Sequence, residues 1–379
     1  MINNQKVDVV ILGSAHPLRG GLANYNHRLA KAYMDQGKKV KIITFSLQYP
    51  NFLFPGKTQY SEEAAPENLD IEVSLNSINP LSWVKVGRYI KKLKPSLLII
   101  KFWIPFMGPS LGTVARIARK NKITKVVSII DNIIPHEKRI GDRLLARYFV
   151  KYVDGFISMS ESVMADLKTF TTTKPAIFTP HPVYDNFGSK IPKTDARNQL
   201  ELKTEGDYLL FFGFIRDYKG LDLLLLAMAD DRIRKMGIKA VIAGEFYTDR
   251  APYDIIIEEN ALQDSVILAT DFIPDSRVGL YFSAADLVVQ PYKDATQSGV
   301  TQVAYSFEKP MVVTDVGGLS EIVPHGHAGY VVDVDPKAIA DAIVDFYSQN
   351  REKEMVEFCS GEKLKYSWET MLEKIDELI

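Results

Sequence analysis

Runs of apolar residues alternate with amphipathic segments along most of the chain. In the first half, apolar runs of strand length predict buried strands at residues 7–13, 39–45, 96–102, 125–131 and 155–159. Between these runs the apolar residues recur at helical spacing, which predicts helices at residues 22–36, 80–93, 109–120 and 138–153. Strands that alternate with helices are typical of a parallel, doubly wound sheet.

The alternation is interrupted at residues 180–206, which are rich in Pro, Lys, Asp and Asn and contain no long apolar run. We interpret this stretch as an interdomain linker. The alternation then resumes and predicts strands at residues 208–212, 239–243, 265–268, 287–290, 310–314 and 329–332. The sequence therefore predicts an α/β protein with two Rossmann-like domains, residues 1–185 and 186–365.

Residues 366–379 predict one more amphipathic helix. Its apolar residues share one face: Trp368, Met371, Leu372, Ile375 and Leu378. We expect this face either to pack on the second domain or to cross back to the first.

The composition is that of a globular protein from a reducing compartment. Of the 379 residues, 46% are hydrophobic and 25% are charged, and the single cysteine, Cys359, cannot form an internal disulfide. We expect no signal peptide after Met1 and no transmembrane helix, because no run reaches about 18 apolar residues. The densest run, residues 97–107, is interrupted by Lys101. These features predict a cytoplasmic protein.

The net charge of −1 conceals an asymmetry between the two halves. Residues 1–185 contain 26 basic and 14 acidic residues, whereas residues 186–379 contain 20 basic and 33 acidic ones. A basic half indicates an acidic partner, such as a phospholipid surface, a pyrophosphate-linked acceptor or nucleic acid. The alternative is that opposite charges help the two domains to dock.

Two glycines, Gly20 and Gly21, separate the first predicted strand from the first predicted helix. Glycines at this place let a backbone loop approach a ligand, and the helix N-terminus offers free N–H groups to an anion. An ordinary turn explains the pair equally well.

A second candidate segment, residues 212–222, follows the first strand of the second half and includes Arg216 and Lys219. Parallel sheets bind ligands at the carboxyl ends of their strands. A guanidinium and an ammonium group placed there can neutralise a diphosphate without a metal ion. The alternative is two solvated charges on a loop, and the position makes us favour the first interpretation.

A third segment, residues 297–301, follows the predicted strand 287–290 and begins a helix. Ser298 is a suitable N-cap, and Gly299 exposes backbone N–H groups. We interpret this helix start as a second anion site, with a helix cap that binds no ligand as the alternative.

Taken together, these motifs resemble the GT-B glycosyltransferases, in particular the large retaining family 4 group. The resemblance spans nearly the whole chain in the right order and is carried by Gly20-Gly21 and by residues 213–222, 243–245, 281–291 and 309–323. It implies two Rossmann-like doubly wound domains that face a central cleft. It also implies an enzyme that transfers a hexosyl group with retention of anomeric configuration, by front-face attack, without a metal ion or cofactor.

The resemblance also implies the ligands and their places. The donor is a nucleotide sugar, UDP- or GDP-linked, with its diphosphate on Arg216, Lys219 and the N–H groups near Gly299. The acceptor is a glycan or a lipid-linked glycan, and nucleic acid is not expected as a partner. The candidate donor-binding residues are Gly213, Gly244, Glu245, Ser298, Gly299, Val300, Thr301 and Gln302. The candidate catalytic residues are Arg216, Lys219 and Asp131, and the candidate acceptor-side residues are His16, Gly20, Gly21 and His136.

Two departures from the family pattern affect individual contacts. The family usually has a Glu-x7-Glu motif whose second glutamate holds the ribose, but Glu308 is the only glutamate between Tyr292 and Pro310. Gln302 is the candidate for this contact. Where the family often has a histidine after its strand, this chain has Asp131, with His136 five positions further on. Asp131 is expected to contact a sugar hydroxyl or act on the acceptor, with a turn cap as the alternative.

Asp333-Val334-Asp335 resembles the metal-binding Asp-x-Asp motif of another glycosyltransferase fold. We interpret it differently, because Pro336 follows directly and Asp335 is placed to cap a helix. The histidines are scattered along the sequence, and we expect no metal site.

Three functions remain open from the sequence. The leading hypothesis is a glycosyltransferase that builds a cell-surface polysaccharide or another glycoconjugate. A non-catalytic subunit that binds a sugar nucleotide is one alternative, and a sugar-nucleotide epimerase of the same fold is the other. The epimerase would need a set of carboxylates and histidines that we do not see assembled.

A basic stripe recurs every four residues in the predicted helix 138–153. Its members are Arg139, Arg143, Arg147 and Lys151, with Ile140, Leu144 and Tyr148 beside them. A solvated helix face is the simpler interpretation. Contact with an anionic membrane or a lipid-pyrophosphate acceptor is the functional one, and it would make the protein peripheral to the inner face of the membrane.

We therefore predict that binding of the protein to phospholipid vesicles rises with the fraction of anionic lipid and falls with salt. Co-sedimentation with vesicles measures this directly. Absent binding, or binding that salt does not weaken, would contradict the membrane interpretation.

Overall fold

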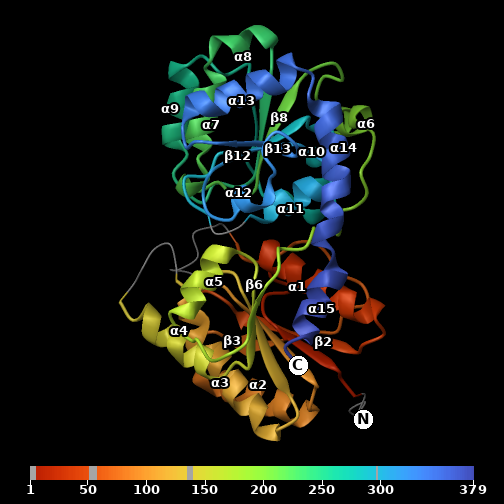
Figure 1. Cartoon of the computed structure of the whole chain (residues 1–379), viewed down its shortest axis with the longest axis vertical. Coiled ribbons are helices and arrows are strands. Elements are labelled where there is room, and N and C mark those ends of the chain that lie inside the picture. Colours follow the sequence, from red (N-terminus) through yellow and green to blue (C-terminus); the bar gives the residue numbers. More distant parts are fainter. Residues whose placement is uncertain (1–5, 51–57, 135–139, 296–297) are drawn as a thin grey trace. The chain divides into compact units, whose positions relative to one another are not determined.

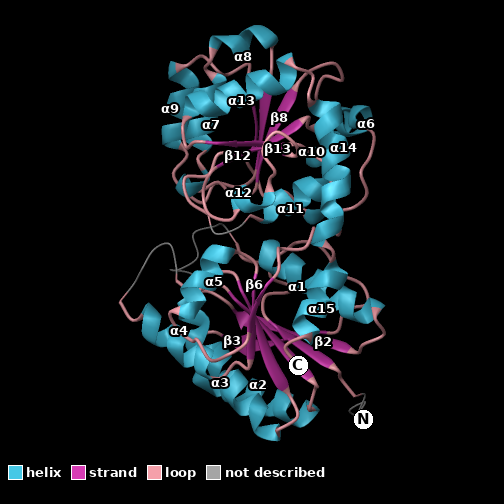
Figure 2. Ribbon diagram, viewed as in Figure 1, coloured by secondary structure: helices cyan, strands magenta, loops and turns pink. Residues whose placement is uncertain are grey.

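The computed structural model describes residues 6–50, 58–134, 140–295 and 298–379. The chain divides into two compact units (Figure 1). Unit 1 comprises Met1–His181 with Trp368–Ile379, and unit 2 comprises Pro182–Ser367. In each unit, helices cover a sheet of parallel strands (Figure 2), so the predicted fold class is confirmed.

In the described part of unit 1, seven parallel strands pair in the order β3-β2-β1-β4-β5-β6-β7. The strands are β1 (Val9–Leu12), β2 (Val40–Leu47), β3 (Ile71–Asn76), β4 (Leu97–Phe102), β5 (Lys125–Ile130), β6 (Gly155–Ser158) and β7 (Ala176–Phe178). The helices are α1 (Gly21–Asp35), α2 (Pro80–Leu93), α3 (Gly108–Ala118), α4 (Asp142–Lys151), α5 (Glu161–Lys168) and α15 (Trp368–Asp376). All residues of β1 and β4 are buried, as expected of central strands with helices on both faces.

The C-terminal helix α15 packs within unit 1 although it follows unit 2 in the sequence. The ring of Trp368 lies 5.1 Å from that of Tyr25 on α1, and the guanidinium of Arg28 lies 5.2 Å from the Trp368 ring. The apolar face foreseen from the sequence is buried here, including Met371 and Ile375.

In the described part of unit 2, six parallel strands pair in the order β10-β9-β8-β11-β12-β13. The strands are β8 (Tyr208–Phe212), β9 (Lys239–Ala243), β10 (Val266–Ala269), β11 (Leu287–Gln290), β12 (Met311–Thr314) and β13 (Gly329–Val332). The helices are α6 (Lys193–Gln199), α7 (Leu221–Met228), α8 (Asp231–Met236), α9 (Ala251–Glu259), α10 (Asp275–Ala284), α11 (Gly299–Ser306), α12 (Leu319–Ile322), α13 (Pro336–Ser348) and α14 (Glu352–Glu362).

The structure contains elements that the sequence pattern did not predict. Strands β3 and β7 lie at the two edges of their sheet. Leu75 is the only buried residue of β3, and β7 has none, so neither strand has the apolar run of a central strand. The amphipathic α5 was also missed. The interpretation of residues 180–206 as a linker is wrong for residues 193–199, which form α6.

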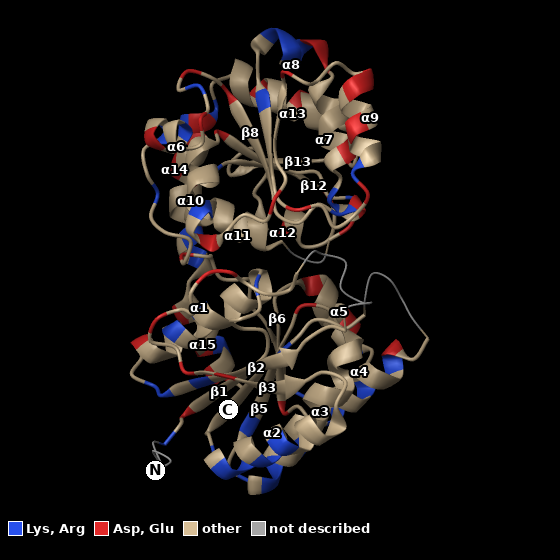
Figure 3. Ribbon diagram, turned by 180° about the vertical axis from the view of Figure 1, so that it is seen from behind, with Lys and Arg blue, Asp and Glu red and all other residues tan. Residues whose placement is uncertain are grey.

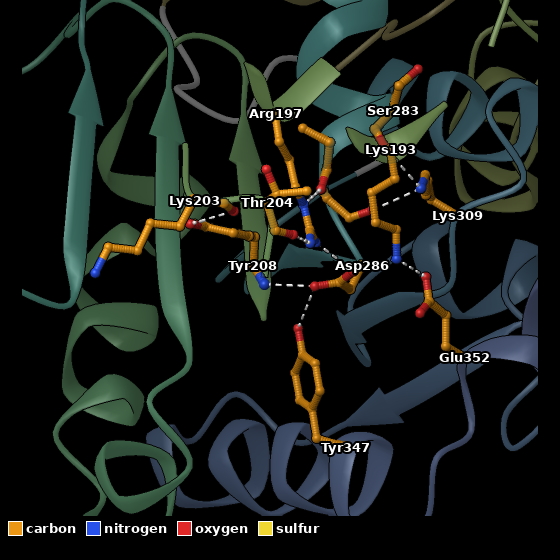
Figure 4. Close-up of polar contacts among 12 residues, drawn as sticks. Lys193, Arg197, Lys203, Thr204, Tyr208, Ser283, Asp286, Lys309, Tyr347 and Glu352 are labelled. Carbon is orange, nitrogen blue, oxygen red and sulfur yellow. Dashed lines mark hydrogen bonds and ion pairs between the residues drawn. The ribbon is translucent and has the colours of Figure 1, made fainter. Parts of the chain in front are cut away.

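A buried carboxylate explains why the polar helix α6 is held against the sheet. Asp286, at the start of β11, accepts hydrogen bonds from Arg197 of α6 at 2.9 Å and from the backbone N–H of Tyr208 at 2.6 Å (Figure 4). Lys193 bridges Asp286 and Glu352 of α14. Because these partners come from separate elements, one carboxylate connects α6, β8, β11 and α14 at the amino ends of the strands.

We predict that Asp286→Ala destabilises unit 2 by about 3–5 kcal/mol, because it leaves the guanidinium of Arg197 buried without its carboxylate. Urea unfolding followed by circular dichroism measures the change. As a control, Lys337→Ala removes the exposed Lys337–Asp341 ion pair and should cost less than about 1 kcal/mol. Equal losses in the two variants would contradict the role assigned to Asp286.

Candidate functional site

The strand order of unit 2 reverses between β8 and β11, so the loops after these two strands leave the sheet on either side of one point. Open α/β sheets bind ligands at such a reversal, outside the carboxyl ends of the strands. Residues 213–220 follow β8, and residues 291–298 lead from β11 to α11. The structure therefore places the candidate residues Arg216, Lys219 and Ser298 on the two loops that flank the reversal.

Two glycines bring the backbones of neighbouring loops close together. Gly213 has a φ of 99° and Gly244 a φ of 146°, and a Cβ on Gly244 would lie 2.1 Å from the Gly213 carbonyl oxygen. A Cβ on Gly213 would lie 3.1 Å from Lys219 Nζ and 3.7 Å from Val300 Cγ2. The structure thus brings Gly213, Gly244, Lys219 and Val300 together.

The loop that carries the two cations is fixed by an ion pair. Lys293, after β11, contacts Asp217 at 2.9 Å and Asp222 at 3.0 Å, and its backbone N–H donates to the Tyr218 carbonyl at 2.7 Å. These contacts bind the loop after β8 to the loop after β11. They hold the segment that carries Arg216 and Lys219 against the loop after β11.

Arg216 and Lys219 have only aromatic rings as charge partners within the described residues. The Arg216 guanidinium lies 5.3 Å from the Tyr247 ring, and Lys219 Nζ lies 5.5 Å from the Tyr292 ring. Burial lowers the pKa of Lys219, and the positive charge of Arg216 acts in the same direction. An anion bound here would favour the charged form of Lys219, so the arrangement suits an anionic ligand.

The start of α11 differs from the prediction in one respect. Ser298 occupies the N-cap position, but its hydroxyl donates to Gln290 Oε1 at 2.8 Å, so the prediction that Ser298 caps the helix with its side chain is wrong. The hydroxyl of Thr301 donates to the same oxygen at 3.0 Å. The N–H groups of Gly299 and Val300 consequently have no side-chain cap in the described structure.

The remaining donor-side candidates have different surroundings. Glu245 is buried, and its carbonyl accepts the N–H of Ile215 at 2.8 Å. Gln302 is fully buried, and neither polar atom of its side chain has a hydrogen-bond partner in the described part of the chain. Glu308 lies beyond the other end of α11, in ion pairs of 2.7 Å with Lys190 and Lys363, and is therefore engaged elsewhere.

In unit 1 the strand order reverses between β1 and β4, and a buried ion pair lies there. Lys101, near the end of β4, contacts Asp131, after β5, at 2.8 Å, and its Nζ lies 3.6 Å from the Tyr25 ring. The side chain of Lys101 is only 2% exposed. Burial lowers the pKa of Lys101, and the Asp131 carboxylate opposes that shift.

In the sequence, Lys101 was interpreted only as an interruption of an apolar run, and its role in the site was missed. The sequence nevertheless indicates this role, because Lys101 stands at the carboxyl end of a strand whose other residues are apolar. Such a charge is retained in a buried strand only with a partner, and Asp131 directly follows the neighbouring strand β5.

The glycine loop of unit 1 is fixed by histidines. The His16 backbone N–H donates to His27 Nε2 at 3.0 Å, and a ring nitrogen of His16 lies 3.1 Å from the Glu63 carbonyl oxygen. Burial, together with the nearby His16, lowers the pKa of His27 to about 4. Gly20, with a φ of 98°, precedes α1, which begins at Gly21. His136 lies outside the described residues.

The basic stripe lies on the exposed face of α4. Arg143, Arg147 and Lys151 are exposed, as are Ile140 and Leu144, whereas Arg139 lies outside the described residues. Helix α2 adds Lys85, Arg88, Lys91 and Lys92, and Figure 3 shows its concentration of basic residues. No helix in the described structure is long and apolar enough to span a bilayer.

The Asp-x-Asp segment has the structure expected of a helix start. Asp335 accepts a hydrogen bond from the Ala338 N–H at 2.9 Å, and Pro336 is the first residue of α13, so the capping interpretation is confirmed. Among the described residues, no group of three or more His, Cys, Asp or Glu side chains is placed to hold a metal ion.

Comparison with known proteins agrees with this geometry. Residues 206–349 match the family profile "Glycosyl transferases group 1". Over 197 residues the chain is 28% identical to the lipopolysaccharide 1,2-N-acetylglucosaminetransferase of Salmonella typhimurium, covering 49% of this chain and 51% of that relative. It is 27% identical over 195 residues to the GDP-mannose:glycolipid 4-beta-D-mannosyltransferase of Xanthomonas campestris, covering 50% of each. The chain thus spans about half the length of these relatives.

The solved structures extend the likeness to the whole fold. Sucrose-phosphate synthase from Thermosynechococcus elongatus superposes with a TM-score of 0.74 at 17% identity, covering 98% of both chains. Anabaena HepE in complex with UDP gives a TM-score of 0.72 at 15% identity, covering 98% of this chain and 99% of that one. The fold is therefore of the GT-B class, as the resemblance implied, and the match to the glycosyl transferases group 1 profile lies within unit 2.

We predict that Lys101 and Asp131 are energetically coupled. Lys101→Met and Asp131→Asn should each destabilise the protein by about 3–5 kcal/mol, because each removes one member of a buried ion pair. The double variant K101M/D131N should recover most of that loss. Urea unfolding of the wild type and the three variants gives the coupling free energy, and strictly additive effects would contradict a paired role.

Proposed function

We propose that this protein is a glycosyltransferase that moves a sugar from a nucleotide diphosphate donor to a glycan or lipid-linked acceptor. The observation that carries the proposal is the pair Arg216 and Lys219. These two cations are fixed at the strand reversal of unit 2 and have no carboxylate partner within the described residues. Natural proteins rarely leave partly buried charges without a counterion, and a diphosphate supplies one.

The same geometry suits the chemistry of the transfer. The nucleoside diphosphate gains negative charge as its bond to the sugar breaks. Arg216, Lys219 and the uncapped N–H groups of α11 would stabilise that charge at positions fixed before the reaction. Because protein groups supply the positive charge, we propose that the reaction needs neither a metal ion nor a cofactor. Retention of anomeric configuration is proposed from the resemblance to the retaining family.

The proposed ligands follow the named relatives. One solved structure of similar fold contains UDP, and one relative uses GDP-mannose by name, so UDP- and GDP-sugars are the proposed donors. Two relatives are named for lipopolysaccharide and glycolipid acceptors. Together with the basic residues 1–185, they favour a lipid-linked acceptor in surface polysaccharide or glycoconjugate synthesis. A cytoplasmic protein at the membrane surface would meet such an acceptor.

For unit 1 we propose an acceptor-side role. Asp131 contacts a sugar hydroxyl, and the loop that contains His16, Gly20 and Gly21 lies after β1, at the strand reversal of this unit. A carboxylate accepts hydrogen bonds from hydroxyl groups, so it suits a neutral polyhydroxylated ligand better than a second phosphate.

One observation favours the alternative of a non-catalytic subunit that binds a sugar nucleotide. Gln302 is neutral and buried without a partner, whereas the family usually has a glutamate to hold the ribose. A subunit that only binds the donor would have less need of that contact. Turnover therefore has to be measured separately from binding.

We predict that UDP- or GDP-sugars raise the melting temperature of the wild type and that Arg216→Ala and Lys219→Ala each weaken donor affinity by about 10–100-fold. Each variant loses a charge-assisted hydrogen bond to the diphosphate, which typically contributes about 1.5–3 kcal/mol. A thermal-shift panel of UDP-, GDP-, ADP- and dTDP-sugars measures the effect, since a ligand at 100 times its Kd stabilises by about 2.7 kcal/mol.

Arg116→Ala is the matched control, because Arg116 is also a cation beside a ring, 5.8 Å from Tyr152, but lies on α3 of unit 1. It should leave donor affinity unchanged. If no nucleotide sugar shifts the wild type, the proposal fails. If a donor binds but is neither hydrolysed nor transferred, the protein is a binding subunit and not the proposed enzyme.

A further inference from the structure

Gln290 is the last residue of β11. Among the buried glutamines of the described residues, its side chain alone forms hydrogen bonds to the start of α11. Its side chain is buried, and Oε1 accepts hydrogen bonds from two hydroxyl groups of the helix start. Ser298 donates at 2.8 Å and Thr301 at 3.0 Å. One amide oxygen therefore accepts from both hydroxyls of the first turn, and the Ser298 hydroxyl also lies 3.3 Å from the Tyr292 hydroxyl.

This arrangement removes the cap that the helix would otherwise form. Ser298 has an extended backbone, with φ −134° and ψ 121°, which is the conformation of an N-cap residue. From that position a serine hydroxyl normally accepts a hydrogen bond from the second or third N–H group of the helix, here Val300 or Thr301. Because the hydroxyl is turned toward Gln290, these N–H groups have no side-chain acceptor in the described structure.

The nitrogen end of the same amide is a further donor near the helix start. Gln290 Nε2 is buried and has no hydrogen-bond partner among the described residues. The two hydroxyls fix which end of the amide is the acceptor, so Nε2 is a donor held beside the helix start. Lys219 Nζ also lies near this helix, since Gly213 borders both Lys219 and Val300. Donors from three segments therefore lie at the start of α11: Gln290 Nε2, Lys219 Nζ and the uncapped N–H groups of the helix itself.

We propose that Gln290 is a positioning residue that keeps the N-terminus of α11 open for a diphosphate by withholding the Ser298 hydroxyl from it. This proposal rests on the proposed donor site and adds the residue that prepares it. Gln290 acts through Ser298, because without the amide the serine hydroxyl would occupy the N–H groups that the diphosphate needs.

The test is a double-mutant cycle on anion affinity. Gln290→Leu releases Ser298 to cap the helix, so the affinity for inorganic pyrophosphate, UDP and GDP should fall by about tenfold, on the order of the strength of a helix cap. In the S298A background no hydroxyl is available to compete, and Gln290→Leu should then lower affinity by less than about threefold. Isothermal titration of the full-length protein measures all four variants.

Tyr305→Phe provides the matched control. Tyr305 is buried in α11 and donates to the Ile322 carbonyl at 2.7 Å, and its hydroxyl makes no hydrogen bond to Ser298, Thr301 or Gln290 in the described structure. Its effect on affinity should be the same in the wild-type and S298A backgrounds. The comparison separates a general loss of a buried hydrogen bond from the specific competition between Ser298 and the ligand.

The outcomes distinguish this proposal from the proposed function. Equal losses from Gln290→Leu in both backgrounds overturn the positioning role and leave the donor site standing. Pyrophosphate binding with the expected dependence on Ser298, but no binding of any nucleotide, supports the positioning role and overturns the proposed function. Failure of the wild type to bind pyrophosphate or any nucleotide overturns both.

Discussion

The strand order of each parallel sheet reverses once, and this reversal determines where loops can form a ligand site. In unit 1 the strands β2 and β3 lie on one side of β1, and β4 to β7 lie on the other. In unit 2 the strands β9 and β10 lie on one side of β8, and β11 to β13 lie on the other. Loops after these strands cannot cover the same face of the sheet. The candidate residues that the structure brings together follow these strands or the strand beside them.

The two reversals carry opposite electrostatic arrangements. In unit 2 the fold presents Arg216 and Lys219 with aromatic rings and no carboxylate among the described residues, and the start of α11 adds uncapped N–H groups. In unit 1 the cation at the reversal, Lys101, is already paired with Asp131. The first arrangement attracts an anion, whereas the second presents a carboxylate that suits hydroxyl groups. This difference agrees with the donor role proposed for unit 2 and the acceptor role proposed for unit 1.

The sequence predicted the features that depend on local pattern. Central strands such as β8 and β11 were located at their observed bounds, because residues buried on both faces form continuous apolar runs. Edge strands such as β3 were missed because they lack that run. The cations Arg216 and Lys219 were found from their position after a strand. Their lack of carboxylate partners depends on tertiary structure and could not be inferred.

The hydrogen bonds and ion pairs among the site's side chains could not be predicted from the sequence, for a similar reason. Ser298 has the residue type and the backbone of an N-cap, yet a glutamine eight positions earlier takes its hydroxyl. Lys101 and Asp131 are thirty positions apart, and only the parallel pairing of β4 and β5 makes them neighbours. Local propensity predicts where a polar group belongs, whereas the hydrogen bond it finally makes depends on what the fold places beside it.

The proposed function requires a nucleoside diphosphate to bind at the strand reversal of unit 2. Hydrogen–deuterium exchange of the full chain, with and without UDP or GDP, measures this binding. We expect slower exchange of the backbone amides in residues 213–220 and 298–302 when the nucleotide is bound. Protection confined to other parts of the chain, with unchanged exchange in these two segments, would contradict it.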